Sequence, residues 1–337
     1  MISTFVYPFL ISLFMLIAII YLSHKYQLFI DDANYDKPQN YHIDSTPRAG
    51  GLGIIFGMFF LILFPFGLKF ILPLTLAFFS GIFEDFHNSL SPKLRLILQL
   101  IAALSAVWFT NSVVTYLGLG ISLPYWAGII FSTFAIVGMM NAINIIDGFN
   151  GLASGVILLI LLSFGITAFT HNNMDIFHIV LITAGATFAF LLLNFPKGKI
   201  FLGDGGAYML GFIVAVIGIF LAGNFNDISP WYILAIFIYP VWEVLFSITR
   251  KLYIGHSPMQ PDSNHLHMLI YRQITKNNPL TAIFIVLSTL PFMTLSTLFP
   301  NKSNTNIEIT GAFILCYSLL YIYLYKKDFR ATISKSK

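Results

Sequence analysis

Long apolar runs follow one another along almost the whole chain, and most approach the length that a helix needs to cross a bilayer. Only 9% of the residues are charged, against about 25% in soluble domains. Because an unpaired backbone amide is costly in lipid, such runs must form helices. The sequence therefore predicts an all-α, polytopic membrane protein with about eleven transmembrane helices, near residues 4–22, 49–66, 70–84, 94–110, 124–143, 153–170, 177–193, 206–223, 230–248, 279–299 and 308–325.

The chain is expected to form a single integral membrane domain over residues 1–337. Its first run lacks the basic start and the small-residue cleavage site of a signal peptide, so we expect a span there. The polar motifs described below lie within a core of about 30–272, two further spans occupy 279–325, and 326–337 is a basic tail. The single cysteine, Cys316, excludes a disulfide within the chain.

The distribution of Lys and Arg predicts the orientation of these helices. If the loop at 23–48 lies on one side of the membrane, that side holds all of the 18 Lys and Arg residues except Lys69 and Lys302. Basic residues accumulate in cytoplasmic loops, so we expect the N-terminus outside and the C-terminus in the cytoplasm. Most acidic residues fall on the same cytoplasmic side. Because the basic residues are scattered over several loops, a nucleic-acid partner is not expected.

The segment NAINIIDGFNGLASG, residues 141–155, places amide and carboxylate groups at the cytoplasmic end of the fifth run. On a helix Asn141, Asn144 and Asp147 share one side, and Gly148 and Gly151 allow a ligand to approach the backbone closely. Asparagine also forms hydrogen bonds between membrane helices. From this segment alone, ligand binding and helix association are equally good interpretations.

Two further motifs carry carboxylates at the ends of runs. In FLGDGGAYMLG, residues 201–211, Asp204 stands among glycines before an apolar run, as expected either for a Mg²⁺ and phosphate site or for a helix cap. In GIFEDFHNSLSPKLR, residues 81–95, Glu84 and Asp85 could supply a general base or attract a metal, or form an ordinary acidic loop. Lys93 and Arg95 resemble the basic residues that flank membrane helices on the cytoplasmic side, called topology anchors below.

Two loops combine histidine with arginine. PQNYHIDSTPRAGGLG, residues 38–53, contains His42 and Arg48, and Arg48 suits either a phosphate or a topology anchor. GHSPMQPDSNHLHMLIYR, residues 255–272, contains His265, His267 and Arg272, which could together bind a pyrophosphate. The His-x-His spacing also suits zinc, but no cysteine supports that interpretation, and a plain hydrophilic loop is the other alternative.

Taken together and in this order, TPRAGG, GIFED, NAINIIDGFNGL, FLGDGG and PDSNHLHML resemble the polyprenyl-phosphate N-acetylhexosamine-1-phosphate transferase family, glycosyl transferase family 4. The resemblance covers about residues 30–272. Eleven spans with a cytoplasmic tail look more like the sugar-nucleotide branch, which starts O-antigen, common-antigen or teichoic-acid glycans, than like the ten-span peptidoglycan enzyme.

The resemblance implies an enzyme of the bacterial inner membrane that transfers sugar-1-phosphate from a UDP-N-acetyl sugar to undecaprenyl phosphate and releases UMP. It implies Mg²⁺, with Mn²⁺ as a substitute, bound by Asp204 and Asn144. The other implied roles are catalysis by Glu84, Asp85, Asp147, His265 and His267; nucleotide binding by Asn150, Gly151, Leu152 and Phe201; and phosphate binding by His42, Arg48 and Arg272.

The chain departs from the family pattern at several positions. The acidic pair begins with Glu84 where the family usually has Asp, Asn88 and Asn150 stand where acids are common, and PQNYH lacks the usual Arg-Lys. The sugar, the glycan pathway and a homodimer therefore stay open. The alternatives are the phospho-N-acetylmuramoyl-pentapeptide transferase, whose histidine run is H-H-H-like, and a membrane transporter, which would carry its charges at the midplane.

Overall fold

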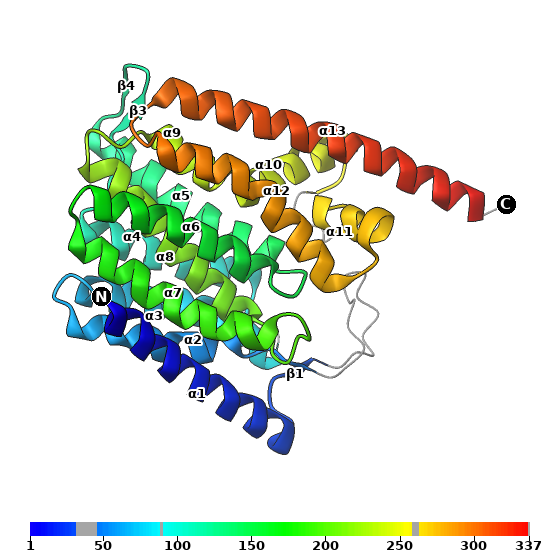
Figure 1. The fold of residues 1–337 in the computed structure, drawn as a ribbon, viewed down its shortest axis with the longest axis horizontal. Helices are drawn as coiled ribbons and strands as arrows, with labels where there is room; N and C mark the ends of the chain where they lie inside the picture. The colour runs from blue at the N-terminus through cyan, green and yellow to red at the C-terminus, as the bar shows by residue number, and fades with distance from the viewer. Residues whose placement is uncertain (32–45, 88–89, 258–262, 336–337) are drawn as a thin grey trace.

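The computed structural model describes residues 1–31, 46–87, 90–257 and 263–335, and these are almost entirely helical. The helices lie side by side along an elongated bundle with two distinct ends (Figure 1). One end carries the antiparallel hairpin of β3 (Tyr116–Gly118) and β4 (Ile121–Ser122). The other end carries β1 (Ile30–Asp31) and β2 (Thr46–Pro47), which also pair antiparallel, together with α11 (Leu266–Ile270).

Each predicted apolar run coincides with one helix or with two consecutive helices. By length and composition, eight helices in the described ranges could cross a membrane, or nine if the bent pair α9–α10 is one span. The chain is therefore an all-α polytopic membrane protein, and the count of eleven spans stays a prediction. The helices are α1 (Ile2–Tyr26), α2 (Gly50–Met58), the 3₁₀ turn η1 (Phe59–Leu63), α3 (Leu68–His87), α4 (Pro92–Thr110), α5 (Tyr125–Ile146), α6 (Leu152–Thr170), α7 (Met174–Asn194), α8 (Gly203–Asn224), α9 (Pro230–Ile236), α10 (Ile238–Tyr253), the π-helical turn η2 (Tyr271–Thr275), α12 (Asn278–Leu298) and α13 (Ser303–Lys335).

Two of the predicted runs do not form one straight helix, and a proline accounts for each. The run near 49–66 ends early, because Pro65 disfavours helical backbone at the preceding residue, Phe64, which is extended. The run near 230–248 is broken between α9 and α10, which meet at 79°. Pro240 has no N–H to donate to the carbonyl of Ile236, and its ring crowds that carbonyl, so the helix cannot continue across this point.

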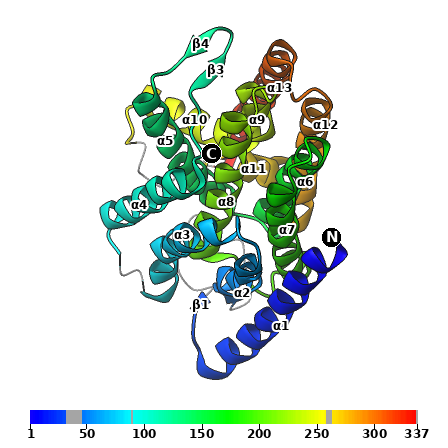
Figure 2. The ribbon, with the colours of Figure 1, turned by 90° about the vertical axis from the view of Figure 1, so that its left-hand side faces the viewer.

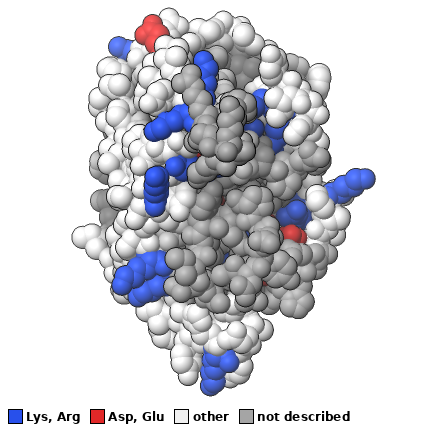
Figure 3. Space-filling view, turned by 90° about the vertical axis from the view of Figure 1, so that its right-hand side faces the viewer, with Lys and Arg blue, Asp and Glu red and all other residues white. Residues whose placement is uncertain are grey.

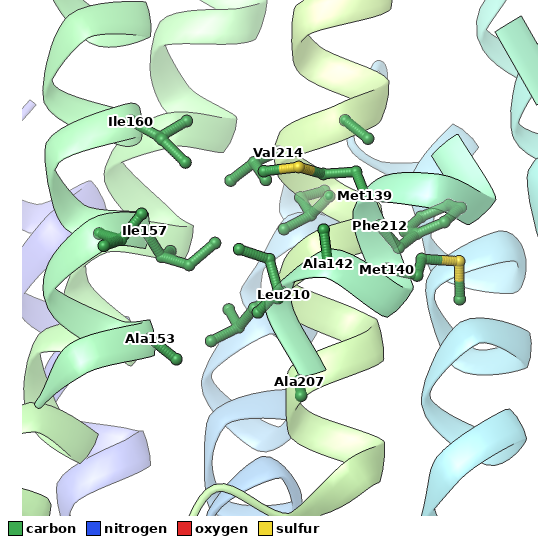
Figure 4. Packing of buried hydrophobic residues seen from close by; sticks show 14 of the residues in the cluster. Met139, Met140, Ala142, Ala153, Ile157, Ile160, Ala207, Leu210, Phe212 and Val214 are labelled. Carbon is green, nitrogen blue, oxygen red and sulfur yellow. The ribbon is translucent and has the colours of Figure 1, made fainter. Parts of the chain in front are cut away.

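Helix α8 forms the centre of the bundle and is buried along nearly its whole length. Figure 2 shows α8 in the middle, with α1 at one edge and α12 and α13 at the other. Apolar side chains of α5, α6 and α8 meet in the core, as Figure 4 shows. Those labelled are Met139, Met140 and Ala142 on α5, Ala153, Ile157 and Ile160 on α6, and Ala207, Leu210, Phe212 and Val214 on α8.

Small residues let two other helices approach the first turn of α8 closely. A Cβ atom on Gly51 of α2 would overlap the backbone of Gly206, and one on Gly81 of α3 would overlap the backbone of Asp204. Glycine at such positions allows helix backbones in a membrane protein to come into contact. Asp204 is therefore held at a junction of three helices, at the end of the bundle opposite the β3–β4 hairpin.

Candidate active site

Asp204, in the first turn of α8, lies at the centre of a group of polar side chains. Its Oδ1 accepts hydrogen bonds from Arg48 Nη2 at 3.2 Å and from Asn144 Nδ2 at 3.0 Å. Its Oδ2 accepts one from Arg95 Nη1, also at 3.2 Å. Asn144 and Asp204, which the family resemblance implies as Mg²⁺ ligands, lie in contact in the structure. We call the group the carboxylate cluster; it consists of Arg48, Glu84, Asp85, Arg95, Asn144 and Asp204.

Asp85, at the end of α3, caps the N-terminus of α8. Its Oδ1 accepts a hydrogen bond from the backbone N–H of Asp204 at 2.8 Å, and its Oδ2 accepts one from Gly205 at 3.0 Å. The first N–H groups of a helix have no partner inside the helix, and a carboxylate there also faces the positive end of the helix dipole. The cap needs glycine at residue 203, where φ is 76° and a Cβ atom would lie 2.7 Å from Asp85 Oδ2. Asp85 thereby fixes the position of Asp204.

Two arginines supply positive charge to the cluster. Arg48 Nη2 also lies 3.8 Å from Asp85 Oδ1, and Arg95 Nη1 lies 3.9 Å from Glu84 Oε2. The backbone of Arg48 is held in place because Phe201 N–H donates to Pro47 O, and Arg48 N–H donates to Phe29 O, each at 2.8 Å. Sequence reasoning treated Arg95 as a topology anchor and missed its contact with Asp204. The sequence carried no signal for this contact, because Arg95 stands at the start of the apolar run near 94–110, where a topology anchor is common.

Asp147 follows α5 directly and lies within the field of the carboxylate cluster. Desolvation by the surrounding helices raises its pKa to about 7, the charge of Arg48 lowers the pKa, and the charge of Asp204 raises it. A carboxyl group with this pKa can exchange a proton near neutral pH. The predicted catalytic residue therefore lies close enough to Arg48 and Asp204 to sense their charges.

The two predicted histidines form a second polar group beside the first. Their rings are stacked, with centroids 5.3 Å apart and planes 3° from parallel. His265 Nδ1 lies 3.0 Å from Glu243 Oε1, and His267 Nδ1 lies 3.4 Å from the hydroxyl of Tyr239. Sequence reasoning did not single out Glu243; the signal was a lone carboxylate inside an apolar run, which is costly without a purpose.

The segment after α5 connects the two polar groups. A Cβ atom built on Gly148 would lie 3.5 Å from His267 Nε2, so this ring edge faces the turn that follows Asp147. The ring of Phe149 contacts His267 and Tyr271, with centroids 5.7 and 5.4 Å apart. The histidines, Asp147 and the carboxylate cluster therefore belong to one site at this end of the bundle, which we call the site end.

Arg272, predicted to bind phosphate, forms an ion pair with the last helix. Its Nε and Nη2 donate to the two oxygens of Asp328 on α13, at 3.2 and 3.0 Å, and its Nη1 donates to Ser263 O at 2.6 Å. Gln273 Nε2 donates to the same carboxylate at 2.6 Å. Arg272 thus ties α13 to the histidine segment, and its role toward a phosphate stays a prediction.

The predicted nucleotide-binding residues lie in the turn between α5 and α6 and in the loop before α8. Asn150 Nδ2 donates to Pro196 O at 3.1 Å, and Gly151 N–H donates to Asn194 Oδ1 at 2.7 Å. Leu152 is buried at the start of α6, and Phe201 bridges to Arg48 through the backbone. These contacts join the two segments, and the roles of the residues toward a nucleotide stay predictions.

Asn141 differs from Asn144 although it lies only one turn away. Its Nδ2 donates to Gln99 Oε1 on α4 and to Val137 O, both at 2.8 Å. Gln99 is buried, so this bond joins two helices inside the bundle. Of the two interpretations of the asparagine motif, helix association applies to Asn141. His42 lies outside the described residues.

The donors of the carboxylate cluster suit Mg²⁺ better than a transition metal. Asp204 offers two carboxylate oxygen atoms beside two arginines, and Asn144, whose Nδ2 donates to Asp204 Oδ1, also carries an amide oxygen. Mg²⁺ in proteins uses one or two carboxylates and completes its shell with water and substrate phosphate. Within the described ranges, no three His, Cys, Asp or Glu side chains converge on a common point as a zinc site requires.

Among the described residues, the surface of the site end carries more basic than acidic side chains. Figure 3 looks onto this end and shows more Lys and Arg than Asp and Glu among the residues that are not grey. Clefts lined by one sign of charge attract ligands of the opposite sign. The site end therefore favours anionic ligands.

Comparison with known proteins agrees with these features. The model of the family described as glycosyl transferase family 4 matches residues 67–222. The chain is 30% identical to the phospho-N-acetylmuramoyl-pentapeptide-transferase of Streptococcus pneumoniae serotype 19F, over 82% of this chain and 90% of that protein. It is 29% identical to the undecaprenyl-phosphate α-N-acetylglucosaminyl 1-phosphate transferase of Thermotoga maritima, over 84% and 85% of the two chains. It is 27% identical to the decaprenyl-phosphate N-acetylglucosaminephosphotransferase of Mycobacterium leprae, over 83% and 80%. The chain belongs to glycosyl transferase family 4.

Proposed function

We propose that this protein transfers N-acetylhexosamine-1-phosphate from a UDP-N-acetyl sugar to a polyprenyl phosphate and releases UMP. The names of the Thermotoga and Mycobacterium relatives make N-acetylglucosamine the first sugar to test. The observation that carries the proposal is the contact of Asp204 with Arg48, Arg95 and Asn144 at the basic end of a membrane-embedded bundle. Both proposed substrates are anionic, and one of them stays in the lipid.

In this reaction an oxygen of the lipid phosphate attacks the β-phosphorus of the nucleotide sugar. The bond between that phosphorus and the oxygen bridging to the α-phosphate breaks, and UMP leaves with the electron pair. Negative charge builds up on the phosphate oxygens, so preorganised cations and hydrogen-bond donors at this point lower the barrier. Arg48 and Arg95 are the guanidinium groups that the fold directs to this point.

Asp204, with the amide oxygen of Asn144, would hold Mg²⁺, which neutralises phosphate charge when bound. The lipid phosphate is already ionised at neutral pH, so its attack needs little help from a base. Both oxygens of Asp85 accept backbone N–H groups of α8, which supports direct attack by the lipid phosphate over a covalent intermediate on this residue. Glu84 and Asp147 are then the candidates to accept a proton from a monoanionic phosphate.

The orientation of the chain follows from the same proposal. A sugar nucleotide is made in the cytoplasm, so the site end faces the cytoplasm and the β3–β4 hairpin faces outward. The excess of Lys and Arg at the site end supports this orientation. We place the protein in the inner membrane of a bacterium, with eleven spans. The location of the polar groups at helix ends speaks against a transporter, which binds its substrate near the midplane.

The pentapeptide transferase is the second candidate, favoured by the 30% identity to the Streptococcus protein. One experiment separates the two. Purified protein in detergent receives Mg²⁺, undecaprenyl phosphate and a single donor: UDP-N-acetylglucosamine, UDP-N-acetylgalactosamine or UDP-N-acetylmuramoyl-pentapeptide. UMP release with a hexosamine donor alone supports the proposal, release with the pentapeptide donor alone replaces it with the second candidate, and no release from folded protein contradicts both.

A further inference from the structure

Glu243 on α10 is a buried carboxylate that the reaction above does not use. Only 1% of the residue is exposed, and its Oε1 lies 3.0 Å from both His265 Nδ1 and the backbone nitrogen of Leu266. We infer that Glu243 is a positioning residue, which fixes the tautomer and the orientation of the His265 ring for the transfer reaction. This inference rests on the proposed function.

The hydrogen bonds determine which nitrogen of His265 carries a proton. Leu266 N–H donates to Glu243 Oε1, so this oxygen is an acceptor, and an acceptor at 3.0 Å requires a proton on His265 Nδ1. In neutral His265 the lone pair is then on Nε2, the nitrogen away from Glu243. A carboxylate behind a functional histidine commonly sets its tautomer and raises its basicity.

The same oxygen also fixes the backbone that carries the histidine. Leu266 is the first residue of α11, so its N–H has no partner inside that helix. By accepting both this N–H and the ring N–H, Glu243 ties the ring and its backbone to α10. Tyr239, one turn earlier on α10, lies 3.4 Å from His267 Nδ1. Helix α10 therefore holds both rings of the stacked pair.

The burial of a full charge indicates a purpose beyond stability. The carboxylate of Glu243 is buried, with the hydroxyl groups of Tyr239 and Tyr317 close to it, and burying a carboxylate costs free energy of folding even where it is hydrogen-bonded. A neutral glutamine could accept the bond from Leu266 at lower cost, but its amide group can also donate to His265 Nδ1, so it does not fix the tautomer. The carboxylate is useful where a partner has to gain positive charge, as a histidine does when it faces a diphosphate.

The orientation reaches the rest of the site through the stacked rings. His267 Nε2 faces Gly148, one residue beyond Asp147, and the ring of Phe149 packs against His267. A rotation of His265 would disturb this stack. We therefore expect Glu243 to influence the transfer rate, although it does not contact the turn between α5 and α6.

The test compares Glu243→Gln and Glu243→Asp with Glu308→Gln, a matched change of an exposed glutamate at the opposite end. We expect Glu243→Gln to lower kcat about 10- to 100-fold with a small change in KM, as loss of such an outer partner does in metal sites. Glu243→Asp should recover part of the rate, and Glu308→Gln should leave it unchanged. In a His265→Ala background, Glu243→Gln should have no further effect on kcat, because it acts through that ring.

A second readout does not depend on turnover. Imidazole-¹⁵N spectra of the detergent-solubilised protein, with His265 assigned by its loss in His265→Ala, report the protonated nitrogen. We expect the Nδ1–H tautomer in the wild type and a mixture of tautomers in Glu243→Gln. A wild-type spectrum with the Nε2–H tautomer, or equal kcat losses with and without His265, would overturn the inference. A wild type that shows the Nδ1–H tautomer but no turnover with any donor would leave Glu243 as assigned and refute the proposed function.

Discussion

The substitution Gly203→Ala tests how firmly Asp85 and the first turn of α8 hold Asp204. Gly203 has φ 76°, where an alanine costs about 1–2 kcal/mol. Its new Cβ atom would also lie 2.7 Å from Asp85 Oδ2 and 2.9 Å from Cγ, so the carboxylate must move. That movement weakens the cap on α8, and loss of a helix cap costs about 0.5–2 kcal/mol. The combined loss is therefore about 1.5–4 kcal/mol.

Gly120→Ala supplies a control with matched backbone strain. Gly120 has φ 79°, but no atom lies within 4 Å of the point that an alanine Cβ atom would occupy, and the residue turns the distant β3–β4 hairpin. This variant should be destabilised only by the strain of an alanine at a positive φ angle. The difference between the two variants therefore isolates the contact with Asp85, and we expect it to be about 1 kcal/mol.

Thermal unfolding in detergent and UMP release measure the two consequences. Gly203→Ala should melt below Gly120→Ala and should lose at least about tenfold in rate, since small displacements of a catalytic group are costly. In an Asp85→Ala background the Cβ atom has room, so Gly203→Ala should then destabilise no more than Gly120→Ala does. Equal melting temperatures and rates for Gly203→Ala and Gly120→Ala would refute the capping role of Asp85.

Three further predictions concern Arg95, the two asparagines of α5 and Asp147. Arg95→Gln removes the donor to Asp204 Oδ2 and should lower the rate about 100-fold, whereas Lys93→Gln, two residues earlier, should have little effect in the same UMP assay. Asn141→Ala should lower the melting temperature but keep most of the activity, whereas Asn144→Ala should abolish Mg²⁺-dependent turnover; the reverse pattern would contradict the assignment. Because desolvation raises the pKa of Asp147 to about 7, the metal-free protein loses stability as the pH rises from about 4, where the unfolded carboxyl ionises, to 7. Asp147→Asn lacks this loss, so its gain in melting temperature over the wild type should be larger at pH 8 than at pH 5.

The helices were predictable because the apolar runs leave the backbone no alternative in a membrane. The breaks in the helices were harder to predict, because the run near 230–248 is apolar on both sides of Pro240 and yet bends by 79°. Asn144 and Asp204 were expected to share a Mg²⁺ ion only from the family resemblance, since each motif by itself also suited helix association or a helix cap. The contacts of Arg48 and Arg95 with Asp204 could not be predicted, because they depend on which helices become neighbours.

Asn141 and Asn144 show the limit of a sequence pattern. They share one side of α5, yet the first faces Gln99 of α4 and the second faces Asp204 of α8. The spacing of three residues predicts that both side chains lie on the same side of the helix. Only the packing of α5 between α4 and α8 shows that Asn141 joins two helices while Asn144 contacts Asp204. The role of Glu243 could not be predicted from the sequence for the same reason. Its partner His265 lies 22 residues later in the chain, beyond the end of α10.

Transfer of a sugar-1-phosphate, as distinct from a sugar alone, is the central claim. It is tested most directly with UDP-N-acetylglucosamine labelled with ³²P in the β-phosphate, incubated with the purified protein, Mg²⁺ and undecaprenyl phosphate. We expect the label to enter the lipid fraction, UMP to appear in equal amount, and Asp204→Ala to abolish both. Label that stays in water-soluble UDP while the sugar enters the lipid would contradict it.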